Sequence, residues 1–85
     1  MNKSYYNAES NLIAKRLRQL RKERGFSQEE LAAQLQLRGV DINQPLISKI
    51  ERNRRFVKAY ELACLCQVLQ VSERDLLADF YNATE

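Results

Sequence analysis

The sequence predicts an all-α fold in which five helices form one small domain. Apolar residues recur at the helical spacing of three and four in five separate segments of the chain. The 85 residues include only two glycines and one proline, too few for the many tight turns of an all-β fold. Apolar residues make up 45% of the chain, enough for one small core. We therefore expect a folded domain over residues 11–81, with a tail at 1–10 and a frayed end at 82–85.

The first predicted helix covers residues 11–24, with Asn11 as its candidate cap. Its apolar stripe consists of Ile13, Leu17 and Leu20. Lysines and arginines cover most of the remaining surface. Two of them, Lys22 and Arg24, fall in the last turn, where cations favour the negative end of the helix dipole. Gly25 then offers the left-handed conformation that ends a helix.

The second predicted helix has the clearest start in the chain. Ser27 and Glu30 have the S-x-x-E spacing of a capping box, in which each residue satisfies a backbone amide of the other. Phe26 and Leu31 are placed to close a hydrophobic staple around this cap. The helix is expected to end near Gly39.

Residues 39–43 form a connector, and a third helix follows it. Either Asn43 or Gln44 caps this helix, because Pro45 disfavours helical angles at the residue before it and suits the first helical turn. Both alternatives place Gln44 at the N-terminal end of the helix. Asn53 is suited to the left-handed position after its last turn.

The fourth predicted helix, residues 58–69, is apolar over a wide arc and is expected to be the central core helix. Its expected core positions are Ala59, Leu62, Ala63, Cys66 and Leu69, joined by Tyr60, Leu65 and Val68. Ser72 caps the fifth helix, with Asp75 three residues later. Its apolar face consists of Leu76, Leu77, Phe80 and Tyr81. This face serves either the core or a dimer interface.

Charge divides the chain into a basic front and an acidic back. Residues 11–58 hold twelve Lys/Arg and five Asp/Glu, a net charge of +7. Residues 59–85 hold one and five, a net charge of −4. A basic front predicts an anionic partner, and charge alone leaves both nucleic acid and a membrane surface open.

Composition excludes several functions. The chain has no histidine, and Cys64 and Cys66 lack the further ligands that a zinc site needs, so we expect no metal and no cofactor. No nucleophile has a nearby base, and the phosphate loops of nucleotide enzymes are absent, so we expect no enzyme. Unpaired thiols, with no transmembrane run or signal peptide, predict a cytoplasmic protein.

The second and third helices each begin with a glutamine, and a basic turn follows them. One helix fits the major groove of DNA, and its first residues reach the base edges. A Gln side chain such as that of Gln44 has the right shape for a bidentate contact to adenine. The basic residues available to neutralise phosphates are Arg52, Arg54, Arg55 and Lys58, together with the arginines of the first helix.

Three stretches carry a resemblance to a known family: RLRQLRKERGFSQEELAAQL (16–35), LISKIERNRR (46–55) and VLQVSERDLL (68–77). On these residues, the sequence resembles the Cro/cI-type (XRE-like) helix-turn-helix DNA-binding proteins. The resemblance implies a compact five-helix bundle of the lambda-repressor-like type. It also implies a transcriptional regulator that places its third helix, about residues 44–52, in the major groove of double-stranded DNA, and we expect it to act as a homodimer.

The resemblance also implies roles for individual residues. The base-contacting positions match Gln44, Pro45 and Lys49. The phosphate-contacting positions match Arg21, Gln28, Asn53, Arg54 and Arg55. Gln28 would also brace Gln44, and Arg21 would pair with Glu51 across two helices. The loop after the third helix would bind phosphate partly through backbone amides.

Two departures from the family pattern are evident. The connector between Leu35 and Ile47 is about five residues longer than in short-turn members, judged by those two apolar anchors, and is expected to extend the second helix by about a turn. Pro45 and Leu46 stand where polar residues are usual. They would pack on a thymine methyl group or read DNA shape.

An alternative function is a protein-interaction or antitoxin-like module that uses the acidic C-terminal half, and this function is compatible with DNA binding. Membrane binding by the basic first helix is a weaker alternative, because its stripe lacks large aromatic anchors.

Overall fold

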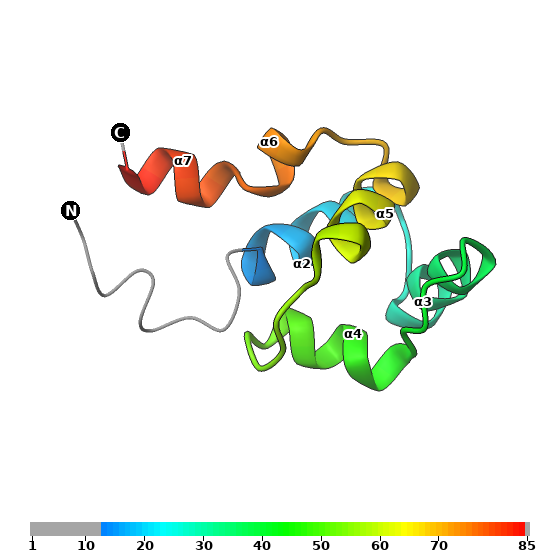
Figure 1. The fold of residues 1–85 in the computed structure, drawn as a ribbon. Helices are drawn as coiled ribbons and strands as arrows, with labels where there is room; N and C mark the ends of the chain where they lie inside the picture. Colours follow the sequence, from blue (N-terminus) through cyan, green and yellow to red (C-terminus); the bar gives the residue numbers. More distant parts are fainter. Residues whose placement is uncertain (1–12, 85) are drawn as a thin grey trace.

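The computed structural model describes residues 13–84, and these form helices with no strand among them. The helices are α2 (Ala14–Glu23), α3 (Gln28–Leu37), α4 (Gln44–Glu51), α5 (Ala59–Leu69), α6 (Glu73–Leu76) and α7 (Ala78–Thr84). Figure 1 shows α2 through α6 packed around a common centre, with α7 projecting from one side. The all-α prediction is confirmed. The expected cap at Asn11 and the tail at 1–10 lie outside the described residues.

Local signals place most helix ends where the sequence predicted them. Ser27 Oγ accepts a hydrogen bond from the Glu30 amide at 3.0 Å, and the Ser27 amide donates to Glu30 Oε1 at 2.8 Å, completing the capping box. The hydrogen bonds from the Ser27 backbone and side chain lower the pKa of Glu30. Gly25 and Gly39 have φ of 77° and 80°, the left-handed conformation expected of them.

The core draws apolar side chains from five helices and from the connector before α4. Its fully or nearly fully buried members are Ile13, Leu17, Leu20, Leu31, Ala32, Leu35, Val40, Ile42, Ile47, Ile50, Leu65, Cys66, Val68, Leu69 and Leu76. The long connector is therefore anchored at two places, Val40 and Ile42. The Gln36 side chain also donates a hydrogen bond to the Ile42 carbonyl at 2.9 Å.

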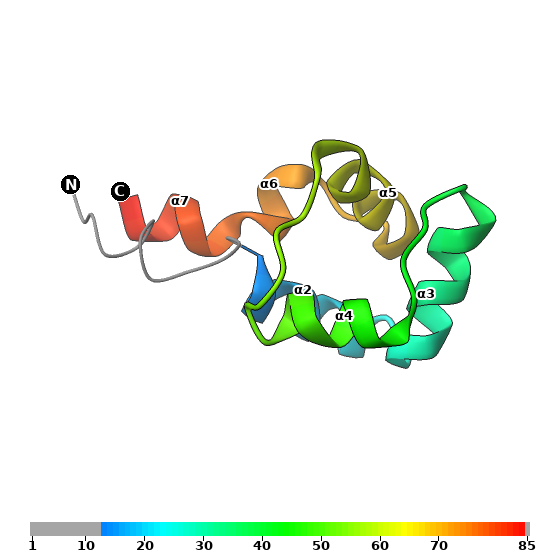
Figure 2. The same cartoon turned by 60° about the horizontal axis from the view of Figure 1, so that its bottom comes forward.

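The described residues form six helices where the sequence predicted five, because the predicted fifth helix divides at Leu77. Leu77 has φ −96° and ψ 16°, outside regular helix geometry. Leu76 is fully buried, whereas α7 leaves the body of the molecule, as both ribbon views show (Figures 1 and 2). Residues 82–84 belong to α7, and fraying of 82–85 stays a prediction.

The buried face of α5 differs from the predicted one. Ala59 and Ala63 are exposed, and Tyr60 is 54% exposed, although all three were expected in the core. Glu61 is only 2% exposed. The observed rotation of α5 buries Glu61 beside a charge partner, Arg55, in the preceding loop. The core residues of α5 are Leu65, Cys66, Val68 and Leu69.

Both cysteines are free thiols, with Cys66 buried and Cys64 half-buried. Burial raises the pKa of the Cys66 thiol to about 11, so this thiol is uncharged and poorly reactive at neutral pH. No cluster of three or more side chains that could hold a metal ion occurs in residues 13–84. None of the helices in this part of the chain is both long and apolar enough to cross a bilayer.

Candidate nucleic-acid interface

Helix α4 lies at one edge of the bundle, at the bottom of Figure 1 and at the front of Figure 2. Ile47 and Ile50 point into the core and are fully buried. Pro45 and Lys49 are exposed, and Gln44 is half-buried. One side of α4 thus anchors the helix, and the other presents the predicted base-contacting residues to solvent.

Asn43 caps α4, which decides between the two alternatives that the sequence left open. Its side chain accepts a hydrogen bond from the Leu46 amide at 3.1 Å, and its φ of −110° and ψ of 176° are extended. Gln44 and Pro45 are then the first two helical residues. Because Asn43 performs the capping, the Gln44 side chain is available for other contacts.

A chain of hydrogen bonds runs along α4 from its first residue, Gln44, through Gln28 of α3 to its last residue, Glu51. Gln44 Nε2 donates to Gln28 Oε1 at 2.8 Å, and Gln28 Nε2 donates to Glu51 Oε1 at 3.1 Å. An ionised carboxylate only accepts hydrogen bonds, so the Gln28 Nε2 group must face Glu51. The Gln28 oxygen must then face Gln44. The charge of Glu51 therefore determines which side-chain atoms Gln44 turns outward.

Arg21 completes this chain from α2. Its Nε donates to Glu51 Oε2 at 2.6 Å, and its Nη2 donates to Glu51 Oε1 at 3.0 Å. Its Nη1 donates to the Phe26 carbonyl at 2.8 Å. The side chains of Arg21 and Glu51 are 9% and 2% exposed. This burial favours an orienting role for Arg21 and disfavours a direct phosphate contact.

The loop after α4 begins with a left-handed turn at Asn53, where φ is 61°. The Asn53 amide donates to the Ile50 carbonyl at 3.0 Å, and the Arg54 amide donates to the Lys49 carbonyl at 2.8 Å. These two bonds are those of a Schellman motif. Both amides are thus used within the chain, which disfavours the expected amide contacts to phosphate at these positions. The exposed Arg54 side chain is the better-placed group.

Arg55 binds inside the molecule. Its Nη1 and Nη2 donate to Glu61 Oε1 and Oε2, both at 3.0 Å, in a bidentate pair. The Lys58 amide also donates to Glu61 Oε1 at 2.9 Å. This geometry favours a structural role for Arg55, and its predicted phosphate contact stays a prediction. The sequence interpretation missed Glu61, although its place three residues after the helix start is the capping-box position that could have identified it.

The pKa of Glu61 reflects competing effects. Burial raises it, but the Arg55 hydrogen bonds, the Lys58 amide and the positive charges of both residues together hold this pKa below its ordinary value. The Glu61 hydrogen bonds in turn raise the pKa of Arg55. The pair is therefore fully ionised at neutral pH.

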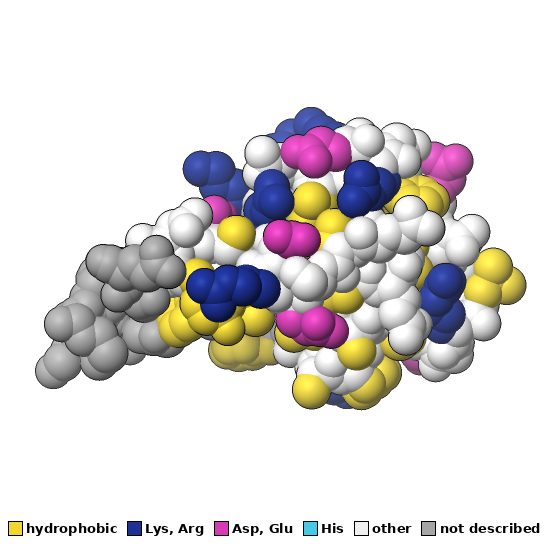
Figure 3. Space-filling view, turned by 90° about the horizontal axis from the view of Figure 1, so that it is seen from above, with side chains coloured by type: hydrophobic (Ala, Val, Ile, Leu, Met, Phe, Trp, Pro, Cys, Tyr) yellow, Lys and Arg dark blue, Asp and Glu magenta, His cyan; other side chains and the backbone are white. Residues whose placement is uncertain are grey.

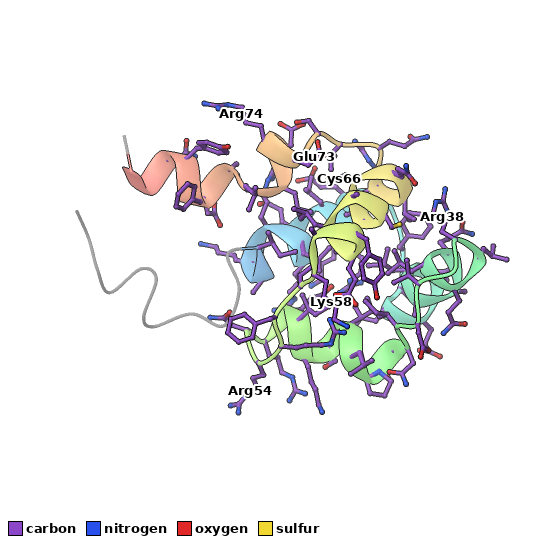
Figure 4. The ribbon with its side chains drawn as sticks, in the orientation of Figure 1. Arg38, Arg54, Lys58, Cys66, Glu73 and Arg74 are labelled. Carbon is purple, nitrogen blue, oxygen red and sulfur yellow. The ribbon has the colours of Figure 1, made fainter. Side chains whose placement is uncertain are left out.

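Not all of the basic residues face α4. Arg16 Nε donates to the Asp75 carbonyl at 3.0 Å, and Arg24 Nε donates to the Leu69 carbonyl at 2.6 Å, so both bind near the C-terminal ends of other helices. Figure 3 shows charges of both signs interspersed on the face opposite α4. In Figure 4, Arg54 points outward beside α4, whereas Arg74 lies at the opposite side. The exposed cations in and directly after α4 are Lys49, Arg52, Arg54 and Lys58.

Comparisons with known proteins agree with this architecture. A family model described as a helix-turn-helix domain matches residues 12–81. Among solved structures, the chain is similar to the restriction-modification controller protein C.AhdI from Aeromonas hydrophila, with a TM-score of 0.70 and 27% sequence identity over 88% of this chain and 99% of that one. No curated protein matches the sequence. The chain therefore belongs to the helix-turn-helix domain family, in agreement with the XRE-like resemblance, and is a DNA-binding transcription regulator and not an enzyme.

Proposed function

We propose that this chain is a sequence-specific regulator that places α4 in the major groove of double-stranded DNA, with Gln44 as its principal base-reading residue. The observation that carries the proposal is the hydrogen-bonded chain from Gln44 through Gln28 to Glu51. An exposed glutamine with a free rotamer would pay conformational entropy on binding a base. A glutamine whose orientation is already fixed avoids much of that cost.

The remaining atoms of Gln44 suit adenine. One hydrogen of its Nε2 is used by Gln28, which leaves the second hydrogen and the Oε1 acceptor. Adenine presents an acceptor at N7 and a donor at N6 in the major groove, and one donor and one acceptor satisfy both. We therefore expect an adenine at the position that Gln44 reads.

Pro45 and Lys49 complete the proposed reading surface. Both are exposed on α4, four residues apart and so on neighbouring turns of one face. Lys49 is suited to the acceptors of guanine, and the Pro45 ring is suited to a thymine methyl group. Because the Pro45 ring cannot hydrogen-bond a polar base edge, this residue would discriminate mainly by weakening binding to the wrong base.

For the phosphates, we propose Arg54 as the main contact, with the side chain of Asn53 beside it and Gln28 at the N-terminal end of α3. Helix N-termini attract anions, and Gln28 is the first residue of α3. Arg21 and Arg55 act in this proposal through their carboxylate partners.

We also propose a homodimer, formed through α7. Phe80 and Tyr81 pack edge to face with ring centroids 5.5 Å apart, and Arg74 lies over the Tyr81 ring at 4.2 Å. Neither aromatic ring belongs to the main core cluster. Two copies would then bind the half-sites of a two-fold operator. The same surface supports the second candidate, a protein-interaction or antitoxin-like module, and light scattering of the protein alone separates a dimer from a monomer that awaits another partner.

We also propose that this regulator is located in the cytoplasm. A protein that binds DNA and keeps Cys64 and Cys66 as free thiols suits the reducing cytoplasm. Its similarity to a restriction-modification controller protein supports a regulatory role without carrying that protein's operator to this chain.

Selection of binding sites from random duplex DNA tests the proposal. We expect enriched palindromic sites with adenine at one position of each half-site. The Gln44→Ala variant should lose preference at that position, whereas Gln67→Ala, at an exposed glutamine of α5, should select the same sites as the wild type. Failure to enrich any sequence, or identical sites from the Gln44→Ala variant, would contradict base reading by Gln44.

A further inference from the structure

Glu61 is a buried carboxylate whose hydrogen-bond partners all come from one surface segment. Its residue is 2% exposed, and it accepts from Arg55 Nη1, Arg55 Nη2 and the Lys58 amide at 2.9 to 3.0 Å. Both partners belong to the α4–α5 loop, residues 52–58. A carboxylate at this depth is costly to bury unless it is paired and hydrogen-bonded, and the loop supplies both requirements.

The loop is consequently fixed at both ends. At its start, the Schellman bonds of Asn53 and Arg54 continue the geometry of α4. At its end, Glu61 holds Arg55 and Lys58, and Arg55 Nη1 also donates to the Phe56 carbonyl at 3.0 Å. One carboxylate thus orders three of the loop's last four residues.

The loop presents Arg54, the main phosphate contact of the proposed complex, together with a second cation, Lys58. Arg54 and Lys58 are both exposed, and Phe56 between them is 75% exposed. Figure 4 shows Arg54 at the outer side of α4 and Lys58 between α4 and the start of α5, both away from Glu73. Fixing the loop before binding lowers the conformational entropy that the two cations lose on contacting phosphates.

We infer that Glu61 is a positioning residue for DNA-backbone binding, which acts through Arg55 to hold the α4–α5 loop in its phosphate-contacting conformation. The inference rests on the proposed DNA-binding function. Charge alone predicts the opposite effect, because a carboxylate near the interface repels phosphates and its removal should tighten binding. The sign of the change on neutralising Glu61 therefore distinguishes positioning from simple electrostatics.

The test compares Glu61→Gln with Glu73→Gln in the full chain, by titration of a fluorescent duplex of any sequence at several salt concentrations. Glu73 is exposed on α6, so its variant makes the same charge change far from the loop. We expect Glu61→Gln to bind roughly fivefold more weakly than Glu73→Gln, with a salt slope smaller by about one, as expected for the loss of about one phosphate contact. Equal or tighter binding by Glu61→Gln would overturn the inference.

A second variant guards against misfolding of the first. The double variant Arg55→Gln with Glu61→Gln removes both charges, so it leaves no unpaired buried charge and keeps the net charge of the wild type. It should bind duplex DNA more weakly than the wild type, which has the same net charge, and hydrogen exchange at the Lys58 amide should accelerate in both variants. Wild-type affinity in the double variant would show that the pair positions nothing.

The wild-type titration separates the two proposals. A wild-type protein without salt-dependent affinity for duplex DNA would overturn the proposed function and this inference together. A wild-type protein that binds, beside a Glu61→Gln variant that binds as well as Glu73→Gln, would overturn only the role of Glu61.

Discussion

Two buried ion pairs, one at the last residue of α4 and one just beyond it, use the same chemistry for different purposes. The Arg21–Glu51 pair leads back along α4 through Gln28 to the half-buried side chain of its first residue, Gln44. The Arg55–Glu61 pair holds the backbone of the loop that follows α4. The difference teaches that a buried ion pair here orients a recognition side chain in one place and a chain segment in the other.

This comparison predicts unequal effects on specificity. Changes in the chain from Arg21–Glu51 to Gln44 should alter which sequence is preferred, because they act on a base-reading residue. Changes at the Arg55–Glu61 pair and its loop should alter affinity for all sequences similarly, because they act on phosphate contacts. The predictions below test this contrast.

The largest effect is expected from Glu51→Ala. It leaves the Arg21 guanidinium buried without its carboxylate, which costs about 3–5 kcal/mol of folding free energy. Urea unfolding followed by circular dichroism measures this loss, and Glu73→Ala, at an exposed carboxylate, is the matched control with a change of less than about 0.5 kcal/mol. A loss for Glu51→Ala no larger than for the control would show that the buried pair is not needed.

The sequence was sufficient for most helix boundaries. Helix caps and left-handed turns depend on a few adjacent residues, so the local sequence predicts them. The examples are the capping box of Ser27 and Glu30 and the left-handed conformations of Gly25 and Asn53. The Arg21–Glu51 contact joins residues 30 positions apart and came only through the family resemblance. Helical periodicity relates only residues a few positions apart, so it could not predict this contact.

Tertiary packing decided what the sequence did not show. A carboxylate within a helix is not expected in a core, and the burial of Glu61 is favourable because Arg55 pairs with it. The connector residues Val40 and Ile42 have no helical period that would mark them as core. The break at Leu77 depends on how α6 seats Leu76, and no proline or glycine signals it.

The next largest effect concerns base reading. Gln44→Ala should weaken binding to the selected site by about 1–3 kcal/mol and leave thermal stability nearly unchanged. Affinities for the selected duplex and for a scrambled duplex separate a loss of sequence preference from a general loss of DNA binding. The Gln67→Ala variant provides the matched glutamine control. An equal loss of affinity on both duplexes would show that Gln44 contacts phosphate and does not read a base.

A smaller effect is expected at the loop. Arg54→Ala should weaken binding to every duplex to a similar degree and lower the salt slope by about 0.9, the effect of one lost phosphate contact. Arg74→Ala, on the opposite side of the molecule, should leave the salt slope unchanged. A change in sequence preference for Arg54→Ala would contradict the distinction between the base-reading residue Gln44 and the loop after α4.

The smallest effect is a loss of folding stability that appears only in acid. The pKa of Glu61 is lower in the folded chain than its ordinary value of 4.5, so its ionised form stabilises the fold above that pH. This stabilisation is lost as pH falls through the folded-state pKa. Unfolding free energies from pH 7 to pH 3 should therefore fall more steeply for the wild type than for Glu61→Gln, and parallel curves would contradict this role of the ionised pair.

The most direct test of the account is a double-mutant cycle between Gln28 and Gln44. Binding of the wild type, Gln28→Ala, Gln44→Ala and the double variant is measured on the selected duplex and on duplexes with single substitutions at the Gln44 position. We predict that the double variant loses less sequence preference than the sum of the two single losses, because both residues act in one hydrogen-bonded chain. Additive losses, or unchanged preference in Gln28→Ala, would contradict the claim that the core of the protein orients its reading residue.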